Sequence, residues 1–122
     1  MYGRSFSECE YAWVSMNKSA RICKLNPIQL DRIHPTQKPV ALYKWLLKNY
    51  AKKDDKILDT HVGSGSSLIA CHDMGFDYIG FEIDEDYYQK AMERIKEHTA
   101  QLSLNDIVNE HTIKPVMQLG MF

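Results

Sequence analysis

Two carboxylates and two glycines carry the chemistry that can be recognised in this sequence. In "ILDTHVGSGSS", residues 57–67, Asp59 ends an apolar run, and Gly63 and Gly65 follow one residue apart. Glycine lets a ligand approach the backbone where a Cβ atom would collide, and a helix starting there presents N–H groups to the ligand. Glu82 lies in the next apolar run, "YIGFEI" (78–83). An acid there can accept hydrogen bonds from both hydroxyls of a ribose.

The spacing separates three classes of ligand. A P-loop requires a lysine after its last glycine, and none follows Gly65. A dinucleotide loop requires a third glycine, but Leu68 stands at that position. Asp59 places a negative charge beside the loop, which repels phosphate and attracts a cation. A ligand with a ribose, a positive charge and no phosphate fits best, and S-adenosylmethionine is such a ligand. The alternative is that the glycines only make a tight turn between two solvated strand ends.

The composition is that of one small soluble globular domain. The 122 residues are 44% hydrophobic and 25% charged. No apolar run reaches the ~18 residues of a membrane span, and the first residues lack the pattern of a signal peptide. The three cysteines, Cys9, Cys23 and Cys71, are odd in number and far apart. We therefore expect no disulfide framework, no metal site and a cytoplasmic location.

Charge is unevenly distributed along the chain. Residues 1–56 carry eleven Lys/Arg and five Asp/Glu, a net +6, whereas residues 57–122 carry four and eleven, a net −7. A basic half can attract a polyanion such as DNA. Two solvated faces that attract each other explain the same pattern, and charge alone does not choose between them.

Hydrophobic periodicity predicts an N-terminal hairpin followed by a helix. The runs at 10–16 and 20–25 are short and β-prone, with a plausible turn between them. Residues 26–37 are predicted to be a loop. Pro39 suits the first turn of a helix because its missing N–H would be unpaired there. The apolar stripe of that helix consists of Val40, Leu42, Tyr43, Leu46, Leu47 and Tyr50.

A strand–loop–helix–strand–helix unit follows. We expect a strand at 56–60, then a helix capped by Ser66 or Ser67 and stopped by Gly75. The run at 78–83 has almost no polar alternation, which favours a strand buried on both faces of a parallel sheet. Asp84 is expected to cap a further helix that ends near His98. Residues 99–122 are expected to form a C-terminal tail.

Two motifs together resemble the DNA amino-methyltransferases, which modify exocyclic amines of adenine or cytosine. "HPTQKPVAL" (34–42) precedes "ILDTHVGSGSS", and "YIGFEID" (78–84) is similar to the second motif of that family. Thr60 and His61 stand where the family has Pro-Phe. The resemblance implies an α/β fold, a partial Rossmann-like methyltransferase domain over residues 1–98, with the hairpin at the far edge of its sheet. It also implies S-adenosylmethionine as cofactor, DNA as partner and a place in bacterial or phage restriction-modification.

The resemblance assigns site residues one by one. Asp59 and the glycine loop would hold the methionine part of the cofactor, and Glu82 its ribose. His34, Thr36 and Lys38 would close over the carboxylate end of the cofactor. The implied cofactor-binding residues are His34, Thr36, Lys38, Asp59, His61, Gly63, Ser64, Gly65 and Glu82.

The catalytic motif of that family is missing. It has the form Asp/Asn/Ser-Pro-Pro-aromatic, and it holds the target amine of a flipped-out base. This sequence has no Pro-Pro, and the nearest match, Asn26-Pro27-Ile28, is predicted to be loop. The order of the segments resembles the permuted class, in which the catalytic half lies upstream. We therefore expect the cofactor-binding part of an enzyme, inactive by itself, with the missing half or a second copy as partner. A non-catalytic module that binds S-adenosylmethionine or a nucleotide, and an interaction protein tethered to DNA machinery such as the sliding clamp, remain as alternatives.

The last five residues, "QLGMF", resemble the short peptides by which bacterial DNA enzymes dock on the sliding clamp. Gln118 would supply a directional hydrogen bond, while Leu119, Met121 and Phe122 would fill an apolar pocket. The alternative is that the three apolar side chains pack on the domain itself or form a simple tail.

Overall fold

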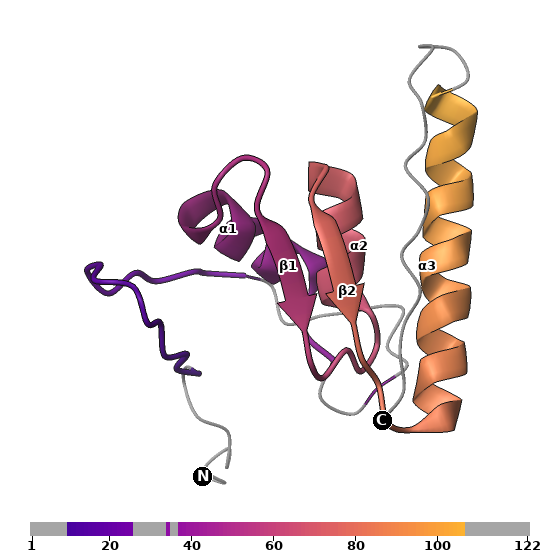
Figure 1. Ribbon diagram of the computed structural model, residues 1–122, viewed down its shortest axis with the longest axis horizontal. Helices are drawn as coiled ribbons and strands as arrows, with labels where there is room; N and C mark the ends of the chain where they lie inside the picture. The colour runs from indigo at the N-terminus through magenta and orange to yellow at the C-terminus, as the bar shows by residue number, and fades with distance from the viewer. Residues whose placement is uncertain (1–9, 26–33, 35–36, 107–122) are drawn as a thin grey trace, which may run out of the picture.

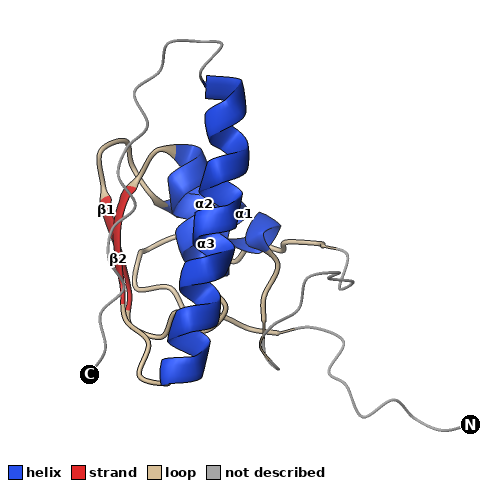
Figure 2. Ribbon diagram, turned by 90° about the vertical axis from the view of Figure 1, so that its right-hand side faces the viewer, coloured by secondary structure: helices blue, strands red, loops and turns tan. Residues whose placement is uncertain are grey.

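The computed structural model describes residues 10–25, 34 and 37–106. Along the chain the elements are α1 (Val40–Tyr50), β1 (Lys56–Asp59), α2 (Ser66–Met74), β2 (Asp77–Gly80) and α3 (Glu85–Asp106). The two strands pair in parallel, with Leu58 opposite Ile79. Figures 1 and 2 show the three helices on the same side of the strands. This is the strand–helix–strand–helix unit that the periodicity predicts, preceded by one helix.

Helix α1 packs as expected and begins one residue after Pro39, which was expected in its first turn. Pro39 is its N-cap residue, in an extended conformation with φ −66° and ψ 143°. Leu47 is buried, and Val40 and Tyr43 pack against the same core. The N–H of Ala51 bonds to the carbonyl of Leu47 where the helix ends. The apolar stripe therefore faces inward, against α2.

Helix α2 ends as predicted but begins differently. Gly75 has φ 76° and its N–H bonds to the carbonyls of Cys71 and His72, so it stops the helix. The N-cap residue is Gly65, also left-handed, and no side chain caps the helix. The expected cap at Ser66 or Ser67 is wrong because both residues are already helical and their hydroxyls bond elsewhere.

Strand β2 is shorter than predicted and buried on one face. Tyr78 and Gly80 are buried, whereas Asp77 and Ile79 between them are exposed. The expectation of burial on both faces is therefore wrong within the described residues, because the helices cover only one side of the sheet. On the other side the side chains of Leu58 and Ile79 are 62% and 44% exposed. The uncovered face of the two strands thus exposes the apolar pair Leu58 and Ile79 next to the charged pair Lys56 and Asp77.

Helix α3 starts at the predicted cap and runs further than expected. The N–H of Tyr87 donates to the Asp84 carboxylate over 3.0 Å. The helix continues to Asp106, so the expectation of a tail from residue 99 is wrong for residues 99–106. That stretch, "TAQLSLND", contains neither glycine nor proline, and nothing in it stops a helix.

The N-terminal hairpin is not formed. Residues 10–25 contain no strand, only a bend at 15–17. Their side chains bond to α1 instead: Lys18 Nζ lies 3.1 Å from the carbonyl of Asn49, and Arg21 Nη1 lies 2.6 Å from its side-chain oxygen. An isolated two-stranded hairpin is marginal in water, and the sheet described here offers it no neighbouring strand.

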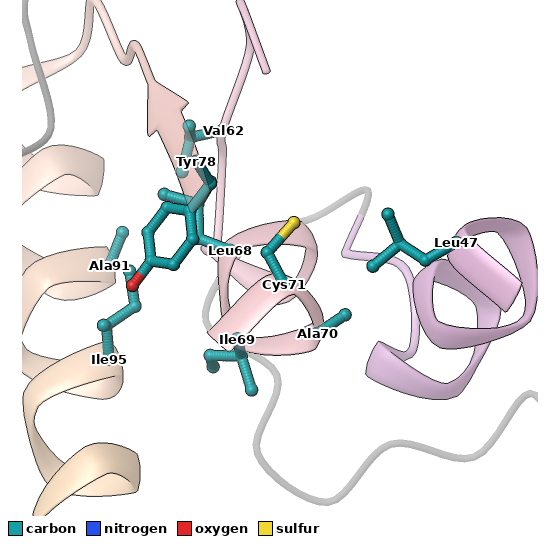
Figure 3. Close-up of a cluster of buried hydrophobic side chains, with 9 residues drawn as sticks. All are labelled: Leu47, Val62, Leu68, Ile69, Ala70, Cys71, Tyr78, Ala91 and Ile95. Carbon is teal, nitrogen blue, oxygen red and sulfur yellow. The ribbon is translucent and has the colours of Figure 1, made fainter. Parts of the chain in front are cut away.

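The core lies between the sheet and the helices, with α2 at its centre (Figure 3). Six consecutive residues of α2, Ser66 to Cys71, are buried, because α1, α3 and the sheet surround that helix on different sides. The core consists of Leu47, Val62, Leu68, Ile69, Ala70, Cys71, Tyr78, Ala91 and Ile95. The glycine loop therefore leads into the best-packed element of the fold. No helix in the described part of the chain is both long and apolar enough to cross a membrane.

Candidate functional site

Asp59 lies where β1 gives way to the glycine loop. Its carboxylate accepts the N–H of His61 over 2.9 Å, and it also accepts the hydroxyl of Ser67 from the first turn of α2. These two bonds tie the end of the strand to both sides of the loop. The Thr60 hydroxyl and His61 Nδ1 are 2.8 Å apart, so the two residues that replace Pro-Phe contact each other.

Glu82 lies at the same edge of the sheet. Parallel strands bring their carboxyl ends together, and Asp59 is paired with Gly80 in the register. Glu82 Oε2 accepts the N–H of Gly63 over 2.7 Å, and Oε1 accepts the N–H of Asp84 over 3.2 Å. Each carboxylate oxygen can accept more than one hydrogen bond. The two acids at the strand ends therefore flank one loop, and Glu82 keeps acceptor capacity.

The two glycines face different neighbours. Both have left-handed backbones, with φ 57° at Gly63 and 86° at Gly65. A Cβ atom on Gly63 would meet the His34 ring at 3.7 Å, an ordinary contact. A Cβ atom on Gly65 would come within 3.2 Å of Ile95 Cδ1. The space that Gly65 leaves is therefore taken up by α3, which packs closely against the loop.

The residues before α1 reach the loop only in part. The His34 ring lies over Gly63, and its centroid is 4.3 Å from that of Tyr87 at the start of α3. Lys38 forms an ion pair with Glu10, so its ammonium group is held by the N-terminal segment. Thr36 lies outside the described residues. Of the two expected closing residues that the structure describes, His34 and Lys38, His34 is thus the one that contacts the loop.

Ser64 is buried, and Arg94 reaches it from α3. The two hydroxyls of Ser64 and Ser66 are 3.2 Å apart. Arg94 Nη1 donates to Ser66 Oγ over 2.8 Å and to the carbonyl of Ser64 over 3.2 Å. The sequence analysis missed Arg94, although its position between Ala91 and Ile95 places it on the inward side of α3. A charged residue next to the apolar stripe of a helix was the signal in the sequence that could have identified it.

A second polar cluster joins the three helices away from the strand ends. Asp73 on α2 accepts Lys44 of α1 over 2.7 Å and His98 of α3 over 2.6 Å. Burial raises the pKa of Asp73, but hydrogen bonds from Lys44 and His98 outweigh it and hold this pKa below its usual value. The cluster lines a cleft of about 390 Å³. Within the described residues, no three His, Cys, Asp or Glu side chains are grouped so that they could hold a metal ion.

Comparison with known proteins identifies a family. The family described as DNA methylase matches residues 5–93 of this chain. The type II methyltransferase M.HpaI of Haemophilus parainfluenzae is 39% identical over 62 residues, which are 51% of this chain and 20% of that protein. The putative methylase YubD of Escherichia coli is 35% identical over 65 residues, 53% of this chain and 29% of that protein.

A solved structure matches the fold. The M1.HpyAVI–SAM complex has 33% sequence identity to this chain and a TM-score of 0.50, over 64% of this chain and 41% of that one. The similarity supports a partial Rossmann-like methyltransferase fold. The chain spans 20% and 29% of those two curated relatives. Most of the length of each relative therefore lies outside its match to this chain.

Proposed function

The chain belongs to the DNA methylase family, and on that premise we propose that it forms the S-adenosylmethionine-binding part of a DNA amino-methyltransferase of the permuted class. The arrangement of Asp59 and Glu82 carries this proposal. They flank one glycine loop at the carboxyl edge of two parallel strands, and each holds a loop N–H. Ligands of open α/β sheets bind at that edge. The relative M1.HpyAVI was solved as a SAM complex.

Each site residue has a proposed role in binding. Glu82 accepts hydrogen bonds from the ribose hydroxyls with the acceptor capacity that Gly63 and Asp84 leave free. Asp59 places its charge near the positive sulfonium group. The ring of His34 covers the loop over Gly63, and Lys38 with Thr36 completes the closing segment. Ser64, Gly65 and His61 shape the loop, and the cofactor supplies the methyl group when it is bound.

Methyl transfer to DNA is proposed for the whole enzyme rather than for this chain alone. The sequence has no Pro-Pro motif, the element that holds the target amine in the family that it resembles. Binding a cofactor does not supply that role. A transfer assay with labelled cofactor and mixed DNA should give no turnover with this chain by itself. Turnover in pure protein would show that its catalytic element has been misread.

The uncovered face of the sheet is a reason to propose a partner that completes the fold. Parallel sheets are normally covered on both faces, yet Leu58 and Ile79 are exposed here. We propose that the part of a methylase which this chain does not match, or a second copy of the chain, covers that face.

The four proposed clamp-binding residues, Gln118, Leu119, Met121 and Phe122, lie outside the described residues. That hypothesis remains, and loss of peptide binding to purified clamp in Phe122→Ala would support it.

Titration calorimetry tests cofactor binding by this site. We expect S-adenosylmethionine to bind the chain and Glu82→Ala to weaken binding by ~1–3 kcal/mol, the scale of lost hydrogen bonds to a charged group. Glu93→Ala on α3 is the matched control, since this exposed acid makes no contact with the loop among those described. No heat at millimolar cofactor, or equal loss in both variants, would contradict the proposal.

A further inference from the structure

Arg94 is a charged residue on the inward side of α3. Its neighbours on that side, Ala91 and Ile95, are 0% and 1% exposed and pack against Gly65. The guanidinium group does not simply extend into solvent. Arg94 Nη1 lies 2.8 Å from Ser66 Oγ and 3.2 Å from the carbonyl oxygen of Ser64. One turn of α3 therefore contacts the glycine loop through both apolar packing and hydrogen bonds.

The acceptors that Arg94 serves are buried. Ser64 and Ser66 are 4% and 2% exposed. Their hydroxyls are 3.2 Å apart, so one can donate to the other, whereas the Ser64 carbonyl accepts from Arg94. Leaving a buried acceptor unpaired is costly. A helix dipole disfavours a cation at its amino end, where Ser66 begins α2, and the charge-assisted bonds to the loop offset that cost.

We propose that Arg94 is a positioning residue for the cofactor loop. Asp59 holds the N–H of His61, Glu82 holds that of Gly63, and Arg94 holds Ser64 and Ser66 from α3. With all three in place the loop has its ligand-binding conformation before the ligand arrives, and the ligand does not have to order it. The ligand in this inference rests on the proposed function, whereas the order of the loop can be measured without it.

Cofactor affinity tests the first consequence. Arg94→Met removes the donors and keeps an unbranched side chain, so S-adenosylmethionine should bind about tenfold more weakly. Arg94→Lys keeps the charge and one donor group, and it should recover part of that loss. Lys96→Met, an exposed position on the same helix, is the control and should bind as the wild type does. Equal affinity of Arg94→Met and wild type would overturn the inference.

Hydrogen exchange without cofactor tests the second consequence and separates the two proposals. The amides of Val62 and Gly65, which are both bonded in the loop region, should exchange faster in Arg94→Met. The amides of Ile57 and Leu58 in β1 should not change. Equal acceleration everywhere would overturn the inference, because Arg94 would then support only global stability. Faster loop exchange in a chain whose wild type binds no cofactor would sustain the role of Arg94 and contradict the proposed ligand.

Discussion

Tyr78 illustrates how one buried side chain serves packing more than bonding. It is 4% exposed, and its ring lies in the core, with the hydroxyl directed toward α3 near Ala91 and Ile95 (Figure 3). The hydroxyl oxygen has no hydrogen-bond partner among the described residues. Burial raises the pKa of Tyr78, and the nearby Cys71 adds to this effect. The aromatic ring is therefore what stabilises this position.

Removing that hydroxyl should not destabilise the protein. Tyr78→Phe keeps the ring and eliminates a buried polar atom, so the free energy of unfolding should stay equal or rise by up to about 1 kcal/mol. Chemical denaturation followed by circular dichroism measures this. A decrease of more than about 1 kcal/mol would mean that the hydroxyl has a partner in solution.

At the scale of elements, one carboxylate ties the three helices together. Asp73 on α2 binds Lys44 of α1 and His98 of α3. Because its pKa is lower in the folded chain than in the unfolded one, its contribution to stability is present above about pH 4, its unfolded value, and is lost as the pH falls through the folded value. The cluster therefore fastens α1 and α3 to α2 at neutral pH.

The same cluster gives a pH-dependent prediction. Asp73→Asn should lower stability by about 1 kcal/mol at pH 7, the scale for a partly exposed charged pair. In a domain of this size that corresponds to about 4 to 8 °C in melting temperature. Thermal melts across pH should show the difference shrinking below about pH 4. Glu93→Gln is the control, and a gap that does not shrink as the pH falls below about 4 would contradict the argument.

The sequence predicted those elements whose signals are local. Pro39, Gly75 and Asp84 act through their own backbone or through a neighbour three residues away, and the structure confirms each boundary. The errors concern features set by distant parts of the chain. Ser66 does not cap α2, and its hydroxyl oxygen instead accepts a hydrogen bond from Arg94, 28 residues away. Ile79 is exposed because no described element covers its face of the sheet.

In the candidate site, too, the features that depend on the order of the elements could be predicted, and those that depend on long-range packing could not. Asp59 and Glu82 meet because parallel strands end at one edge, which follows from the strand–helix–strand order. The packing of Gly65 against Ile95 and the bond from Arg94 depend on how α3 crosses the loop. No spacing within the loop motif contains that information.

At the scale of the whole molecule, the described fold is one-sided. All three helices lie on one side of the sheet (Figure 2). Leu58 and Ile79 are exposed on the other side. β1 and β2 pair only with each other among the described strands, so each has an outer edge. Exposed edges and apolar faces favour association. The chain by itself is therefore expected to self-associate when its partner is absent.

Light scattering measures this association. The wild type should form a dimer or larger species at high concentration, because pairing with a second copy covers the face and an edge at once. Leu58→Lys places a charge in that face and should shift the population toward monomer. Ile22→Lys, an exposed apolar position on the N-terminal segment, is the control. A wild-type monomer at high concentration would sink the idea.

The central claim is that the loop between β1 and α2 binds S-adenosylmethionine. Mapping amide chemical shifts of the labelled chain during a cofactor titration tests it most directly, since every residue reports its own surroundings. We expect saturable shifts at His61, Gly63 and Gly65 in the loop and at Glu82 after β2, with little change around Asp73. The absence of shifts at millimolar cofactor, or shifts centred on the cleft beside Asp73, would contradict it.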